Sequence, residues 1–99
     1  MALVTVGSEQ ITVNTAIGFT STELTDSVMQ ASFQVEDASI RFNTTGVAAV
    51  ADGSNGEKTG NIGDVVTIVG SRDVANFSAI KKGSTNAKLQ VSFEGTGEV

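Results

Sequence analysis

The sequence predicts an antiparallel β-sandwich or jelly roll of seven to eight short strands. Three observations support this fold class. Thr, Ser, Val and Gly dominate the composition, which favours strands over helices. Apolar and polar residues alternate in several separate segments, as in strands that have one buried and one solvated face. Turn-forming residues separate these segments, and no helical pattern is long enough to connect parallel strands.

The clearest alternation lies in residues 31–42. Its apolar positions are Phe33, Val35, Ala38, Ile40 and Phe42. The polar pair Glu36-Asp37 shifts the alternation by one residue, which is typical of a tight turn or a β-bulge. Residues 28–42 therefore predict two short strands, each with one face on a core.

Before this stretch, three short pieces alternate in the same way, at residues 2–6, 11–13 and 17–19. Residues 7–10 form a polar run that begins with glycine, which predicts a turn. The N-terminal part of the chain therefore predicts three short strands joined by tight connections.

Two polar stretches predict longer connections. Residues 20–26 form the first, in which Leu24 reaches the core and residues 22–25 can form one helical turn. Residues 52–63 form the second, with four glycines and one aliphatic residue, and predict a flexible surface loop.

Acidic and amide side chains between the glycines of residues 52–63 resemble part of a calcium loop. Their spacing differs from the twelve-residue pattern, so we expect no metal there.

The second half of the chain predicts the remaining elements. Residues 46–51 form either a short edge strand or an extended link. Residues 64–69 are apolar on both alternations, which predicts a central strand covered on both faces. One turn of helix is expected over residues 73–76, before a strand at residues 77–80. Residues 81–86 predict a hairpin loop whose glycine can adopt a positive φ.

The last strand has the most regular alternation, with Leu89, Val91 and Phe93 directed to the core. The predicted core consists of Phe33, Val35, Ile40, Phe42, Val66, Ile68, Phe77, Leu89, Val91 and Phe93. We expect a single domain over residues 1–99, with residues 1–9 as an N-terminal arm and residues 95–99 as a frayed tail.

Composition argues against several kinds of chemistry. The chain has neither cysteine nor histidine, which removes disulfides, thiolate metal sites and the commonest general base. Its net charge of −5 disfavours a nucleic-acid partner, whose phosphates require a basic surface. No apolar run approaches the roughly 18 residues of a membrane-spanning helix, and the first residues lack the features of a signal peptide. We expect a mature, soluble protein that is not an enzyme and has no cofactor.

Several stretches resemble small phage virion proteins encoded among head genes. They are the run Phe33–Phe42, the Gly63-Asp64 start of an apolar strand, the segment Asn76–Ile80 and the terminal run Ala87–Phe93. The resemblance spans about residues 31–93, and its motifs are structural rather than catalytic. In that family an Asp-Gly and a Pro-Thr follow the Ile-Arg-aromatic motif, whereas other residues occupy positions 43–50 here.

The resemblance implies a β-sandwich subunit of a virion, above all a capsid decoration (cement) protein. Such a protein binds the major capsid protein on the outside of the shell and stabilises the shell. The resemblance further implies a homo-oligomer, with a trimer favoured, located in the virion after assembly in the host cytoplasm. A collar or tail accessory protein is an alternative within the virion. A stand-alone β-sandwich that binds a glycan or another ligand is the alternative from a different class.

Two groups of residues are candidates for partner binding. The N-terminal segment of residues 2–6 is apolar enough to favour pairing with a neighbouring subunit or with the capsid. Three lysines around the predicted loop of residues 81–86 form either a solvated end of the sheet or a docking patch for an acidic partner. The candidate residues are Ala2, Leu3, Val4, Thr5, Val6, Lys81, Lys82 and Lys88.

Overall fold

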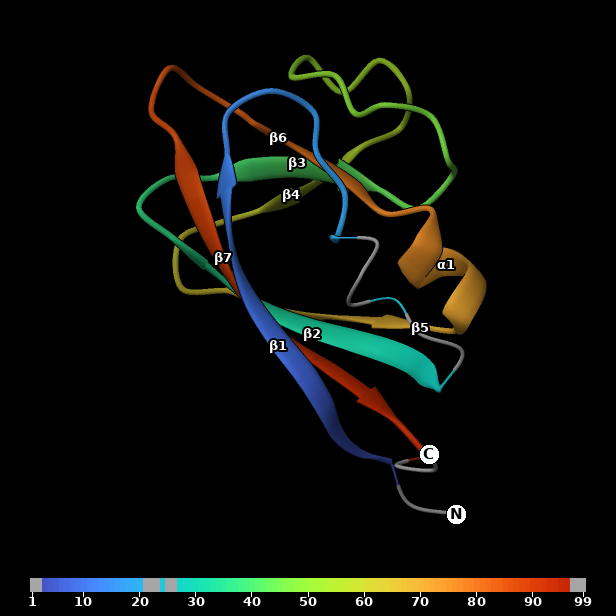
Figure 1. The fold of residues 1–99 in the computed structure, drawn as a ribbon. Coiled ribbons are helices and arrows are strands. Elements are labelled where there is room, and N and C mark those ends of the chain that lie inside the picture. The colour runs from blue at the N-terminus through green and yellow to red at the C-terminus, as the bar shows by residue number, and fades with distance from the viewer. Residues whose placement is uncertain (1–2, 21–23, 25–26, 97–99) are drawn as a thin grey trace.

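A computed structural model describes residues 3–20, 24 and 27–96. Within these residues, seven strands form two antiparallel sheets that pack face to face, and one short helix lies at one end (Figure 1). The predicted all-β sandwich is therefore confirmed. No helix in the described part of the chain is long and apolar enough to cross a membrane.

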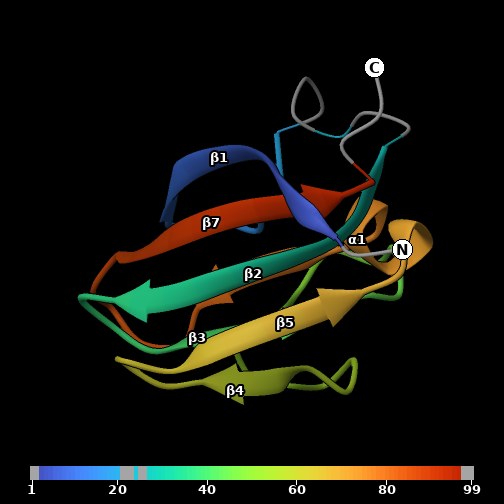
Figure 2. The ribbon, with the colours of Figure 1, turned by 90° about the horizontal axis from the view of Figure 1, so that it is seen from below.

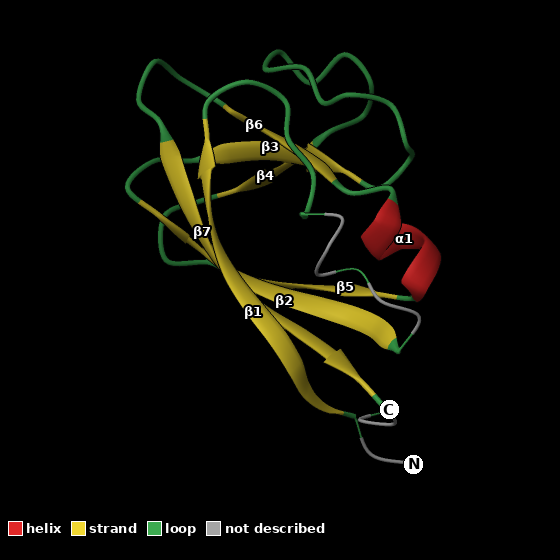
Figure 3. Ribbon diagram, in the orientation of Figure 1, coloured by secondary structure: helices red, strands yellow, loops and turns green. Residues whose placement is uncertain are grey.

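The two sheets have four and three strands, in the orders β1-β7-β2-β5 and β4-β3-β6 (Figure 3). The four-stranded sheet consists of β1 (Val4–Val13), β7 (Ala87–Gly95), β2 (Val28–Glu36) and β5 (Val65–Val69). The three-stranded sheet consists of β4 (Lys58–Gly60), β3 (Ile40–Asn43) and β6 (Ser78–Lys81). The helix α1 (Ser71–Ala75) lies between β5 and β6 in the chain.

The regular alternation of β2 and β7 builds the core between the sheets. Their inward-facing residues lie opposite one another in the pairs Ala31–Phe93, Phe33–Val91 and Val35–Leu89. Nine of the ten predicted core residues are buried, and the tenth, Val66, is half-buried against the cluster. Alternation with a period of two thus identified the buried face of these strands correctly.

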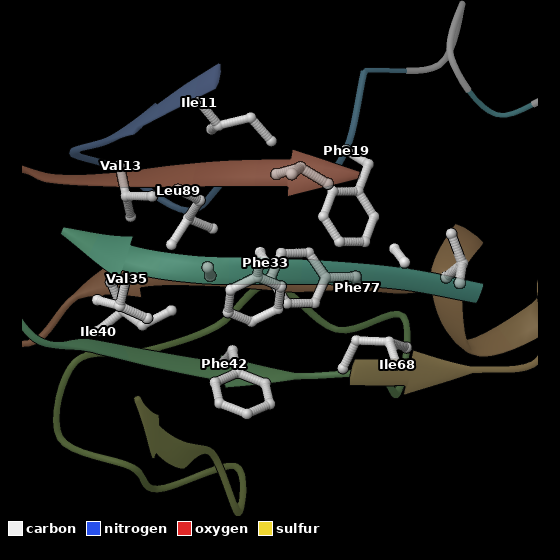
Figure 4. Close-up of a cluster of buried hydrophobic side chains, with 14 of the residues drawn as sticks. Ile11, Val13, Phe19, Phe33, Val35, Ile40, Phe42, Ile68, Phe77 and Leu89 are labelled. Atoms are coloured by element: carbon white, nitrogen blue, oxygen red, sulfur yellow. The ribbon is translucent and has the colours of Figure 1, made fainter. Parts of the chain in front are cut away.

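All five phenylalanines of the chain belong to one core cluster, and Figure 4 labels four of them, Phe19, Phe33, Phe42 and Phe77. Phe19 stacks on Phe77 with ring centroids 4.2 Å apart, and it meets Phe93 edge-on at 5.3 Å. Phe33 meets Phe42 edge-on at 5.8 Å. Because these rings come from both sheets and from the connection after β1, the cluster holds the sheets together.

The two strands predicted within residues 28–42 are confirmed, but they belong to different sheets. Between them, Asp37 adopts a φ of 72°, and the N–H of Ala38 donates to the carbonyl of Glu36 at 2.9 Å. This turn carries the chain from the four-stranded sheet to the three-stranded sheet.

The strand β1 is longer than predicted. Residues 7–10 lie inside it, so the predicted turn is wrong. Ser8 and Gln10 of this segment lie opposite polar residues of β7, on the face of the sheet that is turned to solvent, whereas Glu9 lies opposite Val91. Antiparallel sheets tolerate one solvated face, so a polar run here belongs to a strand. The pairing of β1 with β7 is irregular between Thr5 and Gly7, where a β-bulge interrupts it.

The connection between β1 and β2 contains less strand than the alternation indicated. Residues 17–19 form only an isolated bridge, in which Ile17 and Ala79 exchange backbone hydrogen bonds of 2.9 and 2.8 Å. Leu24 packs against the core, as predicted. The helical turn predicted over residues 22–25 falls, apart from Leu24, outside the described residues.

The strand β5 lies at the edge of its sheet, so the prediction of a central strand covered on both faces is wrong. Figure 2 shows β5 at the margin of the four-stranded sheet. Ile68 is buried and Val66 is half-buried, whereas Val65 and Val69 are 67% and 68% exposed. A strand in a two-layer sandwich has only one face against the other sheet, which accounts for the difference.

Other connections differ in detail from the prediction. Residues 81–86 join β6 to β7, which lie in different sheets, so the predicted hairpin is wrong. Gly83 in this loop is not among the residues with positive φ. Residues 46–51 contain no strand, so the edge-strand alternative is wrong and the segment is a link. Helix α1 begins at Ser71, two residues before the predicted turn of helix. Gly95, expected in a frayed tail, is the last residue of β7.

We expect Phe93→Ala to lower the free energy of unfolding by about 3–5 kcal/mol, because it removes a fully buried ring from the aromatic cluster. The control Val47→Ala, at a position that is 53% exposed, should change it by less than about 0.5 kcal/mol. Urea denaturation followed by far-UV circular dichroism measures both changes. Equal stability of Phe93→Ala and the wild type would show that the core is not organised as described.

We expect Gly95→Ala to cost about 1–3 kcal/mol of stability, because a Cβ at this position would overlap the carbonyl of Ser27. Gly83→Ala is the matched control: its Cβ would meet no atom within 4 Å, and its φ is not positive. The control should change stability by less than about 1 kcal/mol. If both variants melt at the wild-type temperature, the close contact at the end of β7 does not exist in solution.

Candidate interaction surface

The predicted N-terminal arm is part of β1. Val4 and Thr5 lie opposite Gly95 and Glu94 of β7, so one edge of this segment is already paired within the chain. Ala2 lies outside the described residues. Contact of the other edge of the segment with a neighbouring subunit or with a capsid stays a prediction.

The beginning of β1 nevertheless presents aliphatic side chains to solvent. Leu3, Val4 and Val6 are each exposed by more than a third. This end of β1 lies at the far end of the molecule from the long loops between β3 and β4 (Figure 1). The molecule is elongated, with extents of 41, 24 and 21 Å. We call residues 3–6 the β1 tip; it carries exposed apolar side chains, and two of its residues, Val4 and Thr5, pair with β7.

Two of the three candidate lysines interact with groups of their own chain. The Nζ atom of Lys81 donates to the carbonyl of Ser84 at 3.4 Å and to Oδ1 of Asn86 at 3.3 Å. Lys88 Nζ lies 3.8 Å from a carboxylate oxygen of Asp37. Lys81 thus shapes the loop between β6 and β7, and the charge of Lys88 is partly balanced. A docking role for the lysines stays a prediction.

The loop of residues 52–63 contains more order than its composition predicted. Its last part includes β4, so the prediction of a loop throughout is wrong. Glu57 is buried, and its carboxylate accepts hydrogen bonds from the N–H groups of Val50 and Asn55 and from the Asn43 amide, at 3.0–3.1 Å. One carboxylate therefore ties the loop to the link before it and to the end of β3. The mobility of residues 52–56 stays a prediction.

Hydrogen bonds also set the protonation behaviour of the acids in this loop. Burial acts to raise the pKa of Glu57, but hydrogen bonds from backbone N–H groups, including that of Val50, and from Asn43 outweigh it and hold the pKa below 4.5. The N–H of Ser54 donates to Asp52 at 2.9 Å and lowers the pKa of that carboxyl. Both carboxylates, which had resembled calcium ligands in the sequence, thus interact with the protein's own donors.

The solvent face of the four-stranded sheet carries rows of uncharged polar side chains that run across the strands. One row is Gln10, Gln90 and Gln34, and the next is Ser8, Ser92, Ser32 and Thr67. The Ser32 and Thr67 hydroxyls are 3.1 Å apart, and Ser32 also donates to Glu94 at 3.1 Å. A shallow groove of about 400 Å³ runs along the part of this face formed by β1 and β7. Strand alternation predicted that the row members in β2 and β7 face solvent. Ser8 and Gln10 were instead expected in a turn, and Thr67 in a strand covered on both faces, so the sequence gave no sign of the rows.

A second groove opens beside β5, between the edges of the two sheets. It has a volume of about 380 Å³, and Phe42, Val66 and Ile68 contribute its apolar lining. Lys58 and Asp73 supply charges at its margin. Together with the exposed side chains of Val65 and Val69, this β5 groove forms an apolar surface feature that the sequence prediction missed. A central strand was expected here, so its side chains were assigned to the core.

Replacing Glu57 by Gln should make the thermal stability less dependent on pH. A carboxyl whose pKa is lower in the folded state stabilises the fold above its unfolded pKa of about 4.5, and this contribution is lost as the pH falls through the folded value. We therefore expect Glu57→Gln to melt well below the wild type at pH 7, and this difference to shrink as the pH approaches 3. Differential scanning calorimetry between pH 3 and pH 7 measures the two curves. Parallel curves would exclude this role of Glu57.

Within residues 3–20, 24 and 27–96, no three histidine, cysteine or acidic side chains are grouped so as to hold a metal ion. The surface features described above that could meet a partner are the β1 tip, the polar solvent face, the β5 groove and the lysines around the loop after β6. No family model, curated protein or solved structure matches the chain.

Proposed function

We propose that this chain is a structural protein of a phage virion, a capsid decoration protein that binds the outside of the shell as a homo-oligomer and stabilises it. Its partner in this proposal is the major capsid protein. Two features support the proposal: the resemblance over residues 31–93 and the all-β sandwich fold. A collar or tail accessory protein would use the same kind of adhesive surface at another place on the virion.

The single observation that carries the proposal is the β1 tip. Leu3, Val4 and Val6 are exposed at the start of β1, where Val4 and Thr5 pair with β7. Burial of such aliphatic surface in a contact contributes about 25 cal/mol for each Å². Because the backbone is already ordered by pairing, docking through this end costs less conformational entropy than docking through a free arm. Several copies linked in an oligomer would add their weak contacts together.

A second candidate function is a ligand- or glycan-binding module, and the polar solvent face supports it. Amide and hydroxyl groups in the rows of Gln and Ser are suitable partners for sugar hydroxyls. Sugar-binding sheets also stack sugar rings on aromatic side chains. This chain has no Trp and no Tyr, and all five of its phenylalanines are buried. The structural role is therefore the stronger proposal.

The proposal is tested by mixing the purified protein with undecorated particles of its source virus and imaging the particles by cryo-electron microscopy. We expect regular density on the outside of the shell. Val4→Asp should lower the occupancy at least tenfold at a fixed protein concentration, because an unpaired carboxylate would be buried in an apolar contact. The matched control Val47→Asp, at an exposed valine remote from the β1 tip in the chain, should decorate like the wild type.

Thermal unfolding shows whether each variant is folded before its binding is compared. If the wild-type protein leaves the particles bare, the decoration role is wrong. Binding to an array of immobilised glycans with bare particles would favour the second candidate. Density on the collar or tail alone would assign the protein to the accessory class.

A further inference from the structure

The edges of the two sheets differ in how well they are protected against pairing with another strand. Exposed edge strands offer free backbone N–H and C=O groups, and proteins usually protect them with charges, bulges, short length or a covering segment. Among the described residues, the edge strands are β1, β5, β4 and β6. Comparing them shows which edge is available to a partner.

Three of these edges carry recognisable protection. In β1, a bulge between Thr5 and Gly7 interrupts the pairing, and Glu9 lies opposite Val91 on the side of the core. The β4 edge is three residues long and begins with Lys58. The β6 edge is bridged by Ile17 through two backbone hydrogen bonds. None of the three is an uninterrupted template for a new strand.

The fourth edge, β5, carries none of these devices. Its five residues read Val-Val-Thr-Ile-Val, with no charge and no proline. Its pairing with β2 runs without a register shift from Val65 to Val69. These two valines are 67% and 68% exposed, a large exposure for aliphatic side chains in a regular strand. Of the four described edge strands, β5 is therefore the one most available to pair with another strand.

The sequence of β5 also identifies the partner strand. Read in the opposite direction, it gives Val-Ile-Thr-Val-Val, which has the same chemical pattern. In an antiparallel pair centred on Thr67, each Val65 lies opposite Val69 of the other copy, and each Val66 lies opposite Ile68. Cross-strand pairs of β-branched residues are favourable. A strand that complements itself in this way fits an isologous contact across a two-fold axis.

We propose that β5 pairs with β5 of a second copy of this chain, so that the two four-stranded sheets continue into one sheet of eight strands. The exposed valines would cover each other on the solvent face. Val66 and Ile68 of the second copy would extend the apolar lining of the β5 groove. Because a two-fold contact closes on two copies, the inference replaces the trimer implied by the resemblance with a dimer. It does not rest on the proposed function.

Sedimentation velocity of the free protein tests the proposal. The wild type should sediment as a dimer at micromolar concentration, and Thr67→Lys should weaken the dimer at least tenfold, because it places two positive charges opposite each other on the axis. The control Val47→Lys introduces the same charge at another exposed position and should leave the dimer unchanged. Circular dichroism and melting temperature check that both variants are folded.

The register is tested by charge complementation. Val65→Lys and Val69→Asp should each weaken self-association, while an equimolar mixture should form a heterodimer, because position 65 of one copy lies opposite position 69 of the other. The chain has no cysteine, so Thr67→Cys adds a single thiol on the axis. Oxidation should link two copies through it, since opposed residues in such a pair lie about 4.5–5.5 Å apart. Val47→Cys should not link.

A wild type that stays monomeric at all accessible concentrations would overturn the proposal. So would a dimer that Thr67→Lys leaves intact, or a trimer with no response to changes in β5. Because these measurements use no particles, they separate the proposal from the decoration role. A monomeric Thr67→Lys that still decorates shells would confirm the dimer contact and show that decoration does not require it.

Discussion

Aromatic packing between the two sheets is the interaction on which the rest of the structure depends. The chain has no disulfide that could join the sheets, and the strands β2 and β3, although adjacent in sequence, pair with different partners. Phe33 and Phe93 on one sheet and Phe42 on the other, with Phe19 and Phe77 between them, supply the shared contact. Residues far apart in the chain thus meet at one centre, and the sheets cannot slide without breaking the edge contact of Phe33 on β2 with Phe42 on β3.

Outside this core, hydrogen bonds made by single charged side chains, rather than apolar packing, hold the loops in place. The last part of the excursion between β3 and β4, residues 52–57, has no apolar side chain, and the Glu57 carboxylate holds it by accepting three hydrogen bonds. Charged acceptors form stronger hydrogen bonds than neutral ones. These hydrogen bonds therefore fix the path of a loop that has no apolar core of its own. The same principle applies to the shorter loop after β6, where Lys81 serves as the donor.

Alternation in the sequence predicted most of the core but little of the strand order. It reports which side of a strand is buried, and for Leu89, Val91 and Phe93 this was sufficient. It does not report which strands are neighbours, so the edge position of β5 and the separation of β2 from β3 were not predicted. A strand whose inward and outward positions are both apolar is ambiguous, because a central strand and an edge strand with an exposed apolar face share that pattern. The β5 groove follows from the edge position and was missed for the same reason, whereas the β1 tip lies within a segment that the sequence did single out.

The register of β1 and β7 also determines how the molecule would respond to force. Val4 lies opposite Gly95, so the start of β1 and the end of β7 lie at the same end of the sheet. A pull on both chain ends would load this pair first and open the ladder one pair at a time, as a zipper opens. A pull applied along the strands from opposite ends would load many hydrogen bonds together. The sandwich is therefore mechanically weak to traction through its two ends and strong to shear along its length.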